Sequence, residues 1–407
     1  MKEIIKNIYD FLGNKLYFKL FYLFVSLIVV TILKGIPKIT ILNYAAFAWG
    51  ALLILFMIID GYKRRKVYKF DIPLAIFIIV TLFLNIIVYR SSHNLTLWAV
   101  NLILFTVVFS VDVFRDKRQL IKELNYISYF YVGFMFLASI FSLILRFSGK
   151  TIEVGQVVFG TTKGVFENEN ALSIAAALAI VICIYLNNIA KIHRLKMFWL
   201  ANIVIQAVTM VGSHGRSAYL IVVAVIYAFI FISNKNKYFR AILLIIPVIA
   251  CGVFFELDKS NIRDFTSGRS SLWTSASIVI DEHPFAGVGN SNLVEAVKSA
   301  RETDDLPGLE TGGLHNMYVQ TATVNGLVQL VFFLAFVLMI LAFIIQHLDK
   351  LHRKEKLQMT TITSLIVGIL AVNLFESALI YSVSFISMIF WIYLGYLVSI
   401  LDNKNIE

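Results

Sequence analysis

The sequence is poor in charge, cysteine and proline. Only 15% of its 407 residues are charged, against roughly a quarter in soluble domains. Its two cysteines, Cys183 and Cys251, both lie within apolar runs, which argues against a disulfide framework. The opening stretch MKEIIKNIYDFLGNK lacks the apolar core and small-residue cleavage site of a signal peptide, so no cleaved leader is expected.

Apolar residues dominate instead. They make up 59% of the chain, and the mean hydropathy is +0.81. Because a membrane-spanning helix needs about 20 mostly apolar residues, we expect an all-α integral membrane protein with about twelve transmembrane helices. Their predicted ranges are 16–33, 40–60, 72–89, 95–114, 124–146, 170–188, 197–212, 217–233, 241–255, 327–346, 359–376 and 378–400.

The loops between these ranges test the count. Lysine and arginine cluster after each of the first five even-numbered predicted spans, at residues 63–69, 115–122, 191–196, 235–240 and 350–356. Basic residues gather in cytoplasmic loops, so both termini are predicted to be cytoplasmic. The net charge of +11 is therefore interpreted as a topology signal, and nucleic acid is not expected as a partner.

Two outward segments are longer than simple turns. The predicted organisation is transmembrane helices 1–9 over residues 1–255, with a shorter outer loop at 147–169. One large extracytoplasmic loop, residues 256–314, separates helices 9 and 10, and helices 10–12 occupy 315–407. The large loop contains the apolar stretch SLWTSASIVI, which could form an amphipathic helix, so we expect a small folded cap there.

Cationic residues interrupt the apolar pattern at the outward ends. His214 and Arg216 lie in GSHGRSAYL, between the seventh and eighth spans. Arg269 lies in DFTSGRSSLW of the large loop, where Ser270 could cap a helix. The planar fork of arginine suits phosphate oxygens. Either arginine could instead be an interfacial or surface cation without a task.

Polar residues also stand at the heads of two predicted spans. His315 and Asn316 precede the tenth span, where an imidazole could accept a proton from a hydroxyl or donate to a phosphate. Asn170 lies at the start of the sixth span within KGVFENENALS. Polar residues there either cap the helix or bind sugar hydroxyls.

No cofactor is indicated by the pattern. Gly287 and Gly289 of EHPFAGVGN permit a tight turn, but no dinucleotide context surrounds them, and there is no Walker signature. The outward histidines lack metal-ligand spacing, so no metal is expected. Two cations beside an acidic cap suit a substrate with a phosphate or diphosphate near the lipid and a hydroxyl-rich part in the cap. A lipid-linked sugar has this form.

The order and spacing of these motifs resemble those of the O-antigen ligase and Wzy polymerase superfamily. RSAYL (216–220) matches the R-x3-L element of the ligases, and HNMYVQTATVNG (315–326) matches their H-[NSQ]-x9-G element. GRSSLW (268–273) and PFAGVG (284–289) resemble the large-loop pattern. The ligase pattern continues to Gly, Thr or Tyr where this chain has Gln329, a departure that favours a polymerase.

The resemblance implies a metal-independent, inverting glycosyltransferase at the outer face of the bacterial cytoplasmic membrane. It would polymerise undecaprenyl-diphosphate-linked oligosaccharide repeat units into capsular, exopolysaccharide or O-antigen chains, with ligase-type transfer to another acceptor as the alternative. Membrane lipid is an expected partner, and a chain-length regulator and a flippase of the same pathway are candidate partners. The rival of another class is a transporter of lipid-linked glycan, against which the scarcity of mid-membrane charges apart from Glu376 argues.

The resemblance also assigns roles. Arg216 and Arg269 would hold the diphosphate, and His315 would orient or deprotonate the acceptor hydroxyl or add a phosphate contact. The predicted substrate-binding residues are Asn316, Asn170, His214, Tyr318 and Trp273. Alternative general bases in the large loop are Glu295, Asp281 and Glu310.

Overall fold

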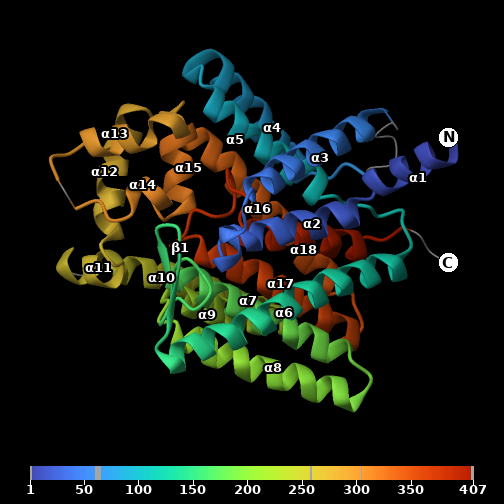
Figure 1. Cartoon of the computed structure of the whole chain (residues 1–407). Coiled ribbons are helices and arrows are strands. Elements are labelled where there is room, and N and C mark those ends of the chain that lie inside the picture. Colours follow the sequence, from blue (N-terminus) through green and yellow to red (C-terminus); the bar gives the residue numbers. More distant parts are fainter. Residues whose placement is uncertain (1, 60–65, 257–258, 304, 405–407) are drawn as a thin grey trace.

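The computed structural model describes residues 2–59, 66–256, 259–303 and 305–404, and this part of the chain is almost entirely helical (Figure 1). Lys63, Arg64 and Arg65 of the first predicted basic cluster lie outside the described residues. The helices up to the large loop are α1 (Lys2–Leu12), α2 (Lys15–Ile28), α3 (Thr40–Ile59), α4 (Asp71–Phe83), α5 (Ser92–Ile103), α6 (Lys117–Ser148), α7 (Glu169–Ile189), α8 (His193–Gly212), α9 (Ser217–Ser233) and α10 (Lys237–Glu256).

The remaining elements include the short helices of the large loop. The later helices are α11 (Lys259–Phe265), α12 (Arg269–Glu282), α13 (Leu293–Ser299), α14 (Leu309–Gly312), α15 (Met317–Asn325), α16 (Leu327–Leu348), α17 (Arg353–Val372) and α18 (Phe385–Leu401). Short 3-10 and π helices are η1 (Ile32–Gly35), η3 (Leu84–Tyr89), η4 (Leu104–Val108) and η5 (Asn290–Asn292). The strands β1 (Thr151–Val154) and β2 (Val157–Gly160) form one antiparallel hairpin.

The helices agree with a membrane protein. Each predicted span overlaps one of the helices α2 to α10 or α16 to α18. Within the described residues, 7 helices are long and apolar enough to cross a membrane, or 8 if the bent pair formed by α1 and α2 counts as one span. Three further apolar helices are shorter. The chain is thus a helical multi-pass membrane protein, and the figure of about twelve spans stays a prediction.

The centre of the bundle is formed by α7, α17 and α18. Every side chain of α18 from Phe385 to Ile400 is buried. The alanines of α7 at 175–177 and 179 are small and buried, which allows α6, α8, α9 and α17 to pack closely around this helix. In α3, by contrast, only 17% of the span is buried, so its apolar side chains face outward as lipid requires.

The two ends of the bundle differ. In Figure 1, α1 and the end of α18 lie on one side of the molecule, whereas β1 and α11 to α15 lie on the other. Ion pairs connect the predicted basic loops at the end where α1 and the end of α18 lie. They join Lys66 with Asp402 (2.5 Å), Lys117 with Glu355 (2.5 Å) and Arg240 with Asp349 (2.6 Å). These loops therefore share one end of the bundle, as their predicted common side requires.

The connection between α17 and α18 is longer than the short turn near residue 376 that the predicted spans 359–376 and 378–400 imply. α17 ends at Val372 and α18 begins at Phe385, with an irregular segment at 373–384. Asn373 ends α17, because its Nδ2 donates to the Ile369 carbonyl (2.8 Å) and its Oδ1 accepts from the Ala378 N–H (3.1 Å). Irregular backbone this deep in a bundle persists only when such internal partners satisfy it.

The large loop has a hydrophobic core of its own. Leu272, Ala276 and Val279 of α12 pack with side chains of α13, α14 and α15, apart from the main core. The stretch SLWTSASIVI therefore forms a helix, as predicted. Ser270 is not its cap, because the helix begins at Arg269 after Gly268 and Ser270 lies within the first turn, where its N–H donates to the Thr266 hydroxyl (3.1 Å). We call residues 269–325 the cap.

A glycine joins the cap to the membrane helices. Gly326 separates α15 from α16 and has a φ of +87°, a left-handed conformation that favours glycine. A Cβ there would lie 2.2 Å from the Phe285 carbonyl oxygen. The Leu327 N–H donates to the Pro284 carbonyl (2.7 Å), so the PFAGVG turn fills the break between the helices.

Gly326→Ala is expected to destabilise the protein by about 2–4 kcal/mol, because left-handed strain adds to a backbone clash. Thermal unfolding in detergent would measure the loss. Gly155→Ala is the matched control, since Gly155 also has a positive φ (+60°) but nothing lies within 4 Å of its added Cβ. Equal melting temperatures for the two variants would contradict the clash.

Candidate functional site

A cavity of about 610 Å³ lies where the start of the cap meets α7, α9 and the 373–384 segment. Arg216 and Arg269, the predicted diphosphate ligands, both line it. His214 and Asn170 of the predicted substrate-binding set line it as well. The other lining residues are Glu169, Ser217, Tyr219, Leu220, Val223, Phe265, Thr266, Ser267 and Phe375. Four predicted site residues from three separate segments therefore share one cavity.

Arg216 stands at the start of α9, after a tightly built turn. A Cβ on Gly215 would lie 1.9 Å from Ser173 Oγ, so the turn is pressed against the first turns of α7. The Arg216 side chain is exposed, and its Nη1 donates to the Asp264 carbonyl (3.2 Å). A guanidinium has five N–H donors, so most of them are available to a ligand in the cavity.

His214 is held by an arginine that the sequence analysis did not identify. Arg146, near the end of α6, places Nη2 3.3 Å from His214 Nε2. Because arginine only donates hydrogen bonds, Nε2 must accept this one. Nδ1 is then the ring nitrogen that His214 can offer a ligand.

Arg269 is the first residue of α12 and is anchored on the 373–384 segment. Its side chain is only 12% exposed. Nη1 donates to the Phe375 carbonyl, and Nη2 lies 3.4 Å from Glu376 Oε1. These two contacts fix the orientation of the guanidinium at the edge of the cavity, which limits the entropy that a ligand contact would cost.

Glu376 joins the predicted site residues to one another. Its Oε1 accepts from Ser217 Oγ (3.2 Å) and from Arg269, and its Oε2 lies 3.9 Å from His315 Nδ1. One carboxylate thus contacts residues at the starts of α9 and α12 and just before α15. The sequence analysis mentioned Glu376 only as an exception among charges at span ends. A lone carboxylate within an apolar run was the signal that could have identified it.

His315 precedes α15 in a left-handed conformation, with a φ of +47°. Its imidazole packs on the turn of α14, where a Cβ on Gly312 would lie 2.2 Å from Cε1 and a Cβ on Gly308 2.7 Å from Nε2. His315 is not among the residues that line the 610 Å³ cavity. It is linked to that cavity through Glu376, on the side of its Nδ1.

The residues beside His315 hold the local backbone. Asn316 caps α15, since its Oδ1 accepts from the N–H groups of Tyr318 (3.0 Å) and Val319 (3.1 Å). The Tyr318 hydroxyl donates to the Leu370 carbonyl of α17 (2.8 Å). Neither side chain lines the cavity, and their assignment to substrate binding stays a prediction.

Trp273 and Asn170 differ in whether they line the cavity. The Trp273 indole N–H donates to the Leu314 carbonyl (2.9 Å), and its ring packs on Phe375, a lining residue (5.8 Å between centroids), but Trp273 itself does not line the cavity. Asn170 does line the cavity. The cap of α7 is its neighbour Asn168, whose Oδ1 accepts from the Ala171 N–H (2.7 Å), so the Asn170 amide is not needed for that contact.

The acidic alternatives for a general base lie elsewhere. Glu310 pairs with Lys298 at 2.6 Å, and the hydrogen bond and charge of Lys298 lower the pKa of Glu310, which makes it a weaker base. Asp281 and Glu295 are exposed on α12 and α13. Among the described residues, no three His, Cys, Asp or Glu side chains gather in a group that could hold a metal ion.

One wall of the cavity is apolar and exposed. Tyr219 and Val223 lie on the outward face of α9, a turn apart, and Phe265 extends from α11. This apolar wall extends from the two arginines along the exposed face of α9. The cavity therefore combines forked cations with a hydrocarbon surface, which suits an anionic head group on a lipid chain.

Comparison with known families identifies the central part of the chain. Residues 200–334 match the family model Wzy_C, described as O-antigen ligase. The match includes Arg216, Arg269 and His315, whereas Asn170 and Glu376 lie outside it. No curated protein matches the chain. The chain is therefore similar to the O-antigen ligase family over residues 200–334, which supports a membrane glycan-processing enzyme and agrees with the resemblance of its motifs.

Proposed function

We propose that the protein polymerises undecaprenyl-diphosphate-linked oligosaccharide repeat units at the outer face of the bacterial cytoplasmic membrane. The observation that carries this proposal is the 610 Å³ cavity in which Arg216 and Arg269 border the exposed apolar wall of α9. A lipid diphosphate has one part for each surface. The basic loops gather at the opposite end of the bundle, which supports an outward position for the cavity.

The donor half of the reaction uses the two arginines. The bond between the anomeric carbon and the diphosphate oxygen breaks, and negative charge develops on that oxygen. Forked donors aimed at the diphosphate stabilise this charge in the transition state. Because the lipid diphosphate is itself the leaving group, the transfer needs no nucleotide and no metal ion.

The acceptor half uses His315. A hydroxyl oxygen of the acceptor sugar attacks the anomeric carbon from the face opposite the diphosphate, and its proton passes to the imidazole. This single displacement inverts the anomeric centre. Glu376 lies 3.9 Å from His315 Nδ1 and stabilises the imidazolium that forms. The products are the lengthened glycan and the free lipid diphosphate.

A ligase-type transfer is the second candidate. The matched family is described as O-antigen ligase. A ligase would give the glycan to a different acceptor. Gln329 stands where the ligase pattern has Gly, Thr or Tyr, which favours polymerisation. The two functions share the donor chemistry at the arginines and differ only in the molecule that presents the hydroxyl.

An assay with purified protein tests the proposal. The protein in nanodiscs is given a lipid-diphosphate-linked repeat unit, without nucleotide and with a metal chelator, and the products are separated on a gel. We expect a ladder spaced by one repeat, reduced by about 100-fold or more in His315→Ala, the usual scale for loss of a general base.

The other outcomes separate the candidates. Transfer that occurs only after a different acceptor is added would identify a ligase. A ladder of equal intensity in His315→Ala would remove the role of His315 while keeping the polymerase. No turnover of the donor under any of these conditions would contradict glycan transfer itself.

A further inference from the structure

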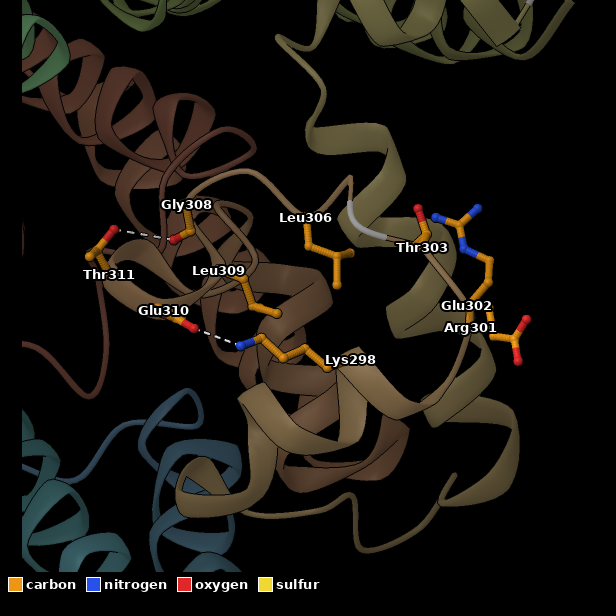
Figure 2. Close-up of a pocket in the computed structure, with 9 residues that line it drawn as sticks. All are labelled: Lys298, Arg301, Glu302, Thr303, Leu306, Gly308, Leu309, Glu310 and Thr311. Carbon is orange, nitrogen blue, oxygen red and sulfur yellow. Dashed lines mark hydrogen bonds and ion pairs between the residues drawn. The ribbon is translucent and has the colours of Figure 1, made fainter.

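A second cavity, of about 950 Å³, opens in the cap between α13, α14 and the chain that links them (Figure 2). Figure 2 shows Leu309 beside the ion pair of Lys298 and Glu310, and Leu306 between this pair and Arg301. The proposed reaction at the arginine cavity uses none of these side chains. The cap cavity therefore needs an explanation of its own.

The lining chemistry of this cavity differs from that of the arginine cavity. Two cations, Lys298 and Arg301, are balanced by two carboxylates, Glu302 and Glu310. Threonine hydroxyls and two leucines complete the lining. This balance disfavours a phosphate, which attracts an excess of cations. Charged donors and acceptors around a small apolar surface suit a sugar, whose hydroxyls form hydrogen bonds while its C–H face packs on leucine.

The walls are fixed by contacts with the folded cap. Lys298 Nζ lies 2.6 Å from Glu310 Oε1, which ties α13 to α14. Arg301 Nη2 donates to Ser271 Oγ (2.7 Å) and to the Ser271 carbonyl (3.1 Å), which ties the opposite wall to α12. Leu309 is buried in the core of the cap. A preformed cavity of this kind loses little entropy when a ligand binds.

The cap cavity lies against His315. Gly308 lines the cavity, and a Cβ on Gly308 would be 2.7 Å from His315 Nε2. Nδ1 of the same ring is on the side of Glu376 and the arginine cavity. The imidazole thus stands between the two cavities, and the turn at 308–312 separates its Nε2 from the cap cavity.

We infer that the cap cavity binds a sugar residue of the acceptor glycan that is remote from the reacting hydroxyl. The acceptor then extends past the turn at 308–312, and its hydroxyl reaches the Nδ1 side of His315, where the donor lies. The cavity binds carbohydrate whatever the reaction, whereas the acceptor role rests on the proposed function. The donor diphosphate occupies the arginine cavity on the other side of the imidazole. Two sites of different chemistry then hold the donor and the acceptor of one transfer.

Binding of a sugar without lipid or phosphate tests the site directly. The probe is the reducing oligosaccharide of one repeat unit, released from the lipid-linked donor by mild acid and titrated calorimetrically into the protein in nanodiscs. We expect the double variant Lys298→Ala/Glu310→Ala to weaken this binding at least about tenfold, since it removes two charged hydrogen-bond partners. Both side chains are at least 50% exposed, so folding should be unaffected.

A matched control uses the ion pair of Lys117 and Glu355 (2.5 Å), which lies at the opposite end of the bundle. Lys117→Ala/Glu355→Ala is expected to bind the oligosaccharide as the wild type does. Equal affinity of the cap double variant and the wild type, or no binding to the wild type, would overturn the proposal. Loss of binding in the cap variant with no ladder in any protein would keep the glycan site and refute the proposed function instead.

A second variant tests the link between the cavity and His315. Gly312→Ala should displace the imidazole, because its Cβ would lie 2.2 Å from Cε1. We expect the ladder to fall at least about tenfold while oligosaccharide affinity stays unchanged. Gly133→Ala, with nothing within 4 Å of the added Cβ, is the control. A wild-type ladder from Gly312→Ala would refute the positioning of His315 by the turn that borders the cap cavity.

Discussion

Arg216→Lys is expected to slow glycan transfer roughly a hundredfold while the protein stays folded. Lysine keeps the positive charge but loses the planar fork that contacts two oxygens of one phosphate. The side chain is exposed at the start of α9 and accounts for one internal hydrogen bond, to the Asp264 carbonyl, so its replacement disturbs little of the structure. Initial rates of ladder formation at saturating donor would measure the effect, and thermal unfolding would confirm the fold.

Arg90→Lys is the control for this substitution. Arg90 is also exposed, and its Nε donates to a single backbone carbonyl, that of Ile87. It lines neither the arginine cavity nor the cap cavity. The rate for Arg90→Lys should equal that of the wild type. If Arg216→Lys also transfers at the wild-type rate, the forked contact with the diphosphate is wrong, and a point charge is sufficient at that position.

The positions of the helices could be predicted because they depend on local composition. Long apolar runs interrupted by basic clusters indicate the spans, and each predicted range overlaps a helix. Arg216 and Arg269 could be predicted to meet because both stand at outward ends with phosphate-binding chemistry, and both line the 610 Å³ cavity. In these cases the residue type and its position relative to the membrane are sufficient for the prediction.

The network around Glu376 could not be predicted in the same way. It depends on α17 stopping at Val372, where an apolar run continues in the sequence. The Asn373 side chain and the contact of the Met317 N–H with the carbonyls of Asn373 (3.0 Å) and Glu376 (3.1 Å) hold the irregular segment in place. These partners are distant along the chain, so hydropathy alone favours an unbroken pair of spans.

The placement of His315 between two cavities was also beyond the sequence. The spacing of HN and Gly326 predicted a site residue at the head of a helix. It contained no information on the side of the ring that faces Glu376 or on the turn that covers Nε2. That turn depends on Gly308 and Gly312, whose lack of a side chain has meaning only when the imidazole is seen beside them.

Glu376→Gln is expected to lower the rate constant of transfer roughly tenfold to a hundredfold, with little change in the apparent affinity for donor. The amide keeps an oxygen for the Ser217 hydroxyl (3.2 Å) but loses the charge that fixes Arg269 and faces His315. Because this carboxylate acts through its neighbours, Glu376→Asp should recover part of the rate. The measurement is the dependence of ladder formation on donor concentration, which separates the rate constant from the apparent affinity.

Glu123→Gln is a stringent control, since Glu123 is a buried carboxylate that pairs with an arginine, Arg115, as the part-buried Glu376 pairs with Arg269. Glu123 also accepts from the Tyr396 hydroxyl (2.9 Å). It lies in the α6 region where the chain's basic loops gather, at the end of the bundle away from both cavities. Both variants lose one ion pair and should lose similar stability, but only Glu376→Gln should lose rate. Equal rates in the two variants would show that Glu376 serves the fold alone, and the polar network joining α9, α12 and α15 would then have no part in the reaction.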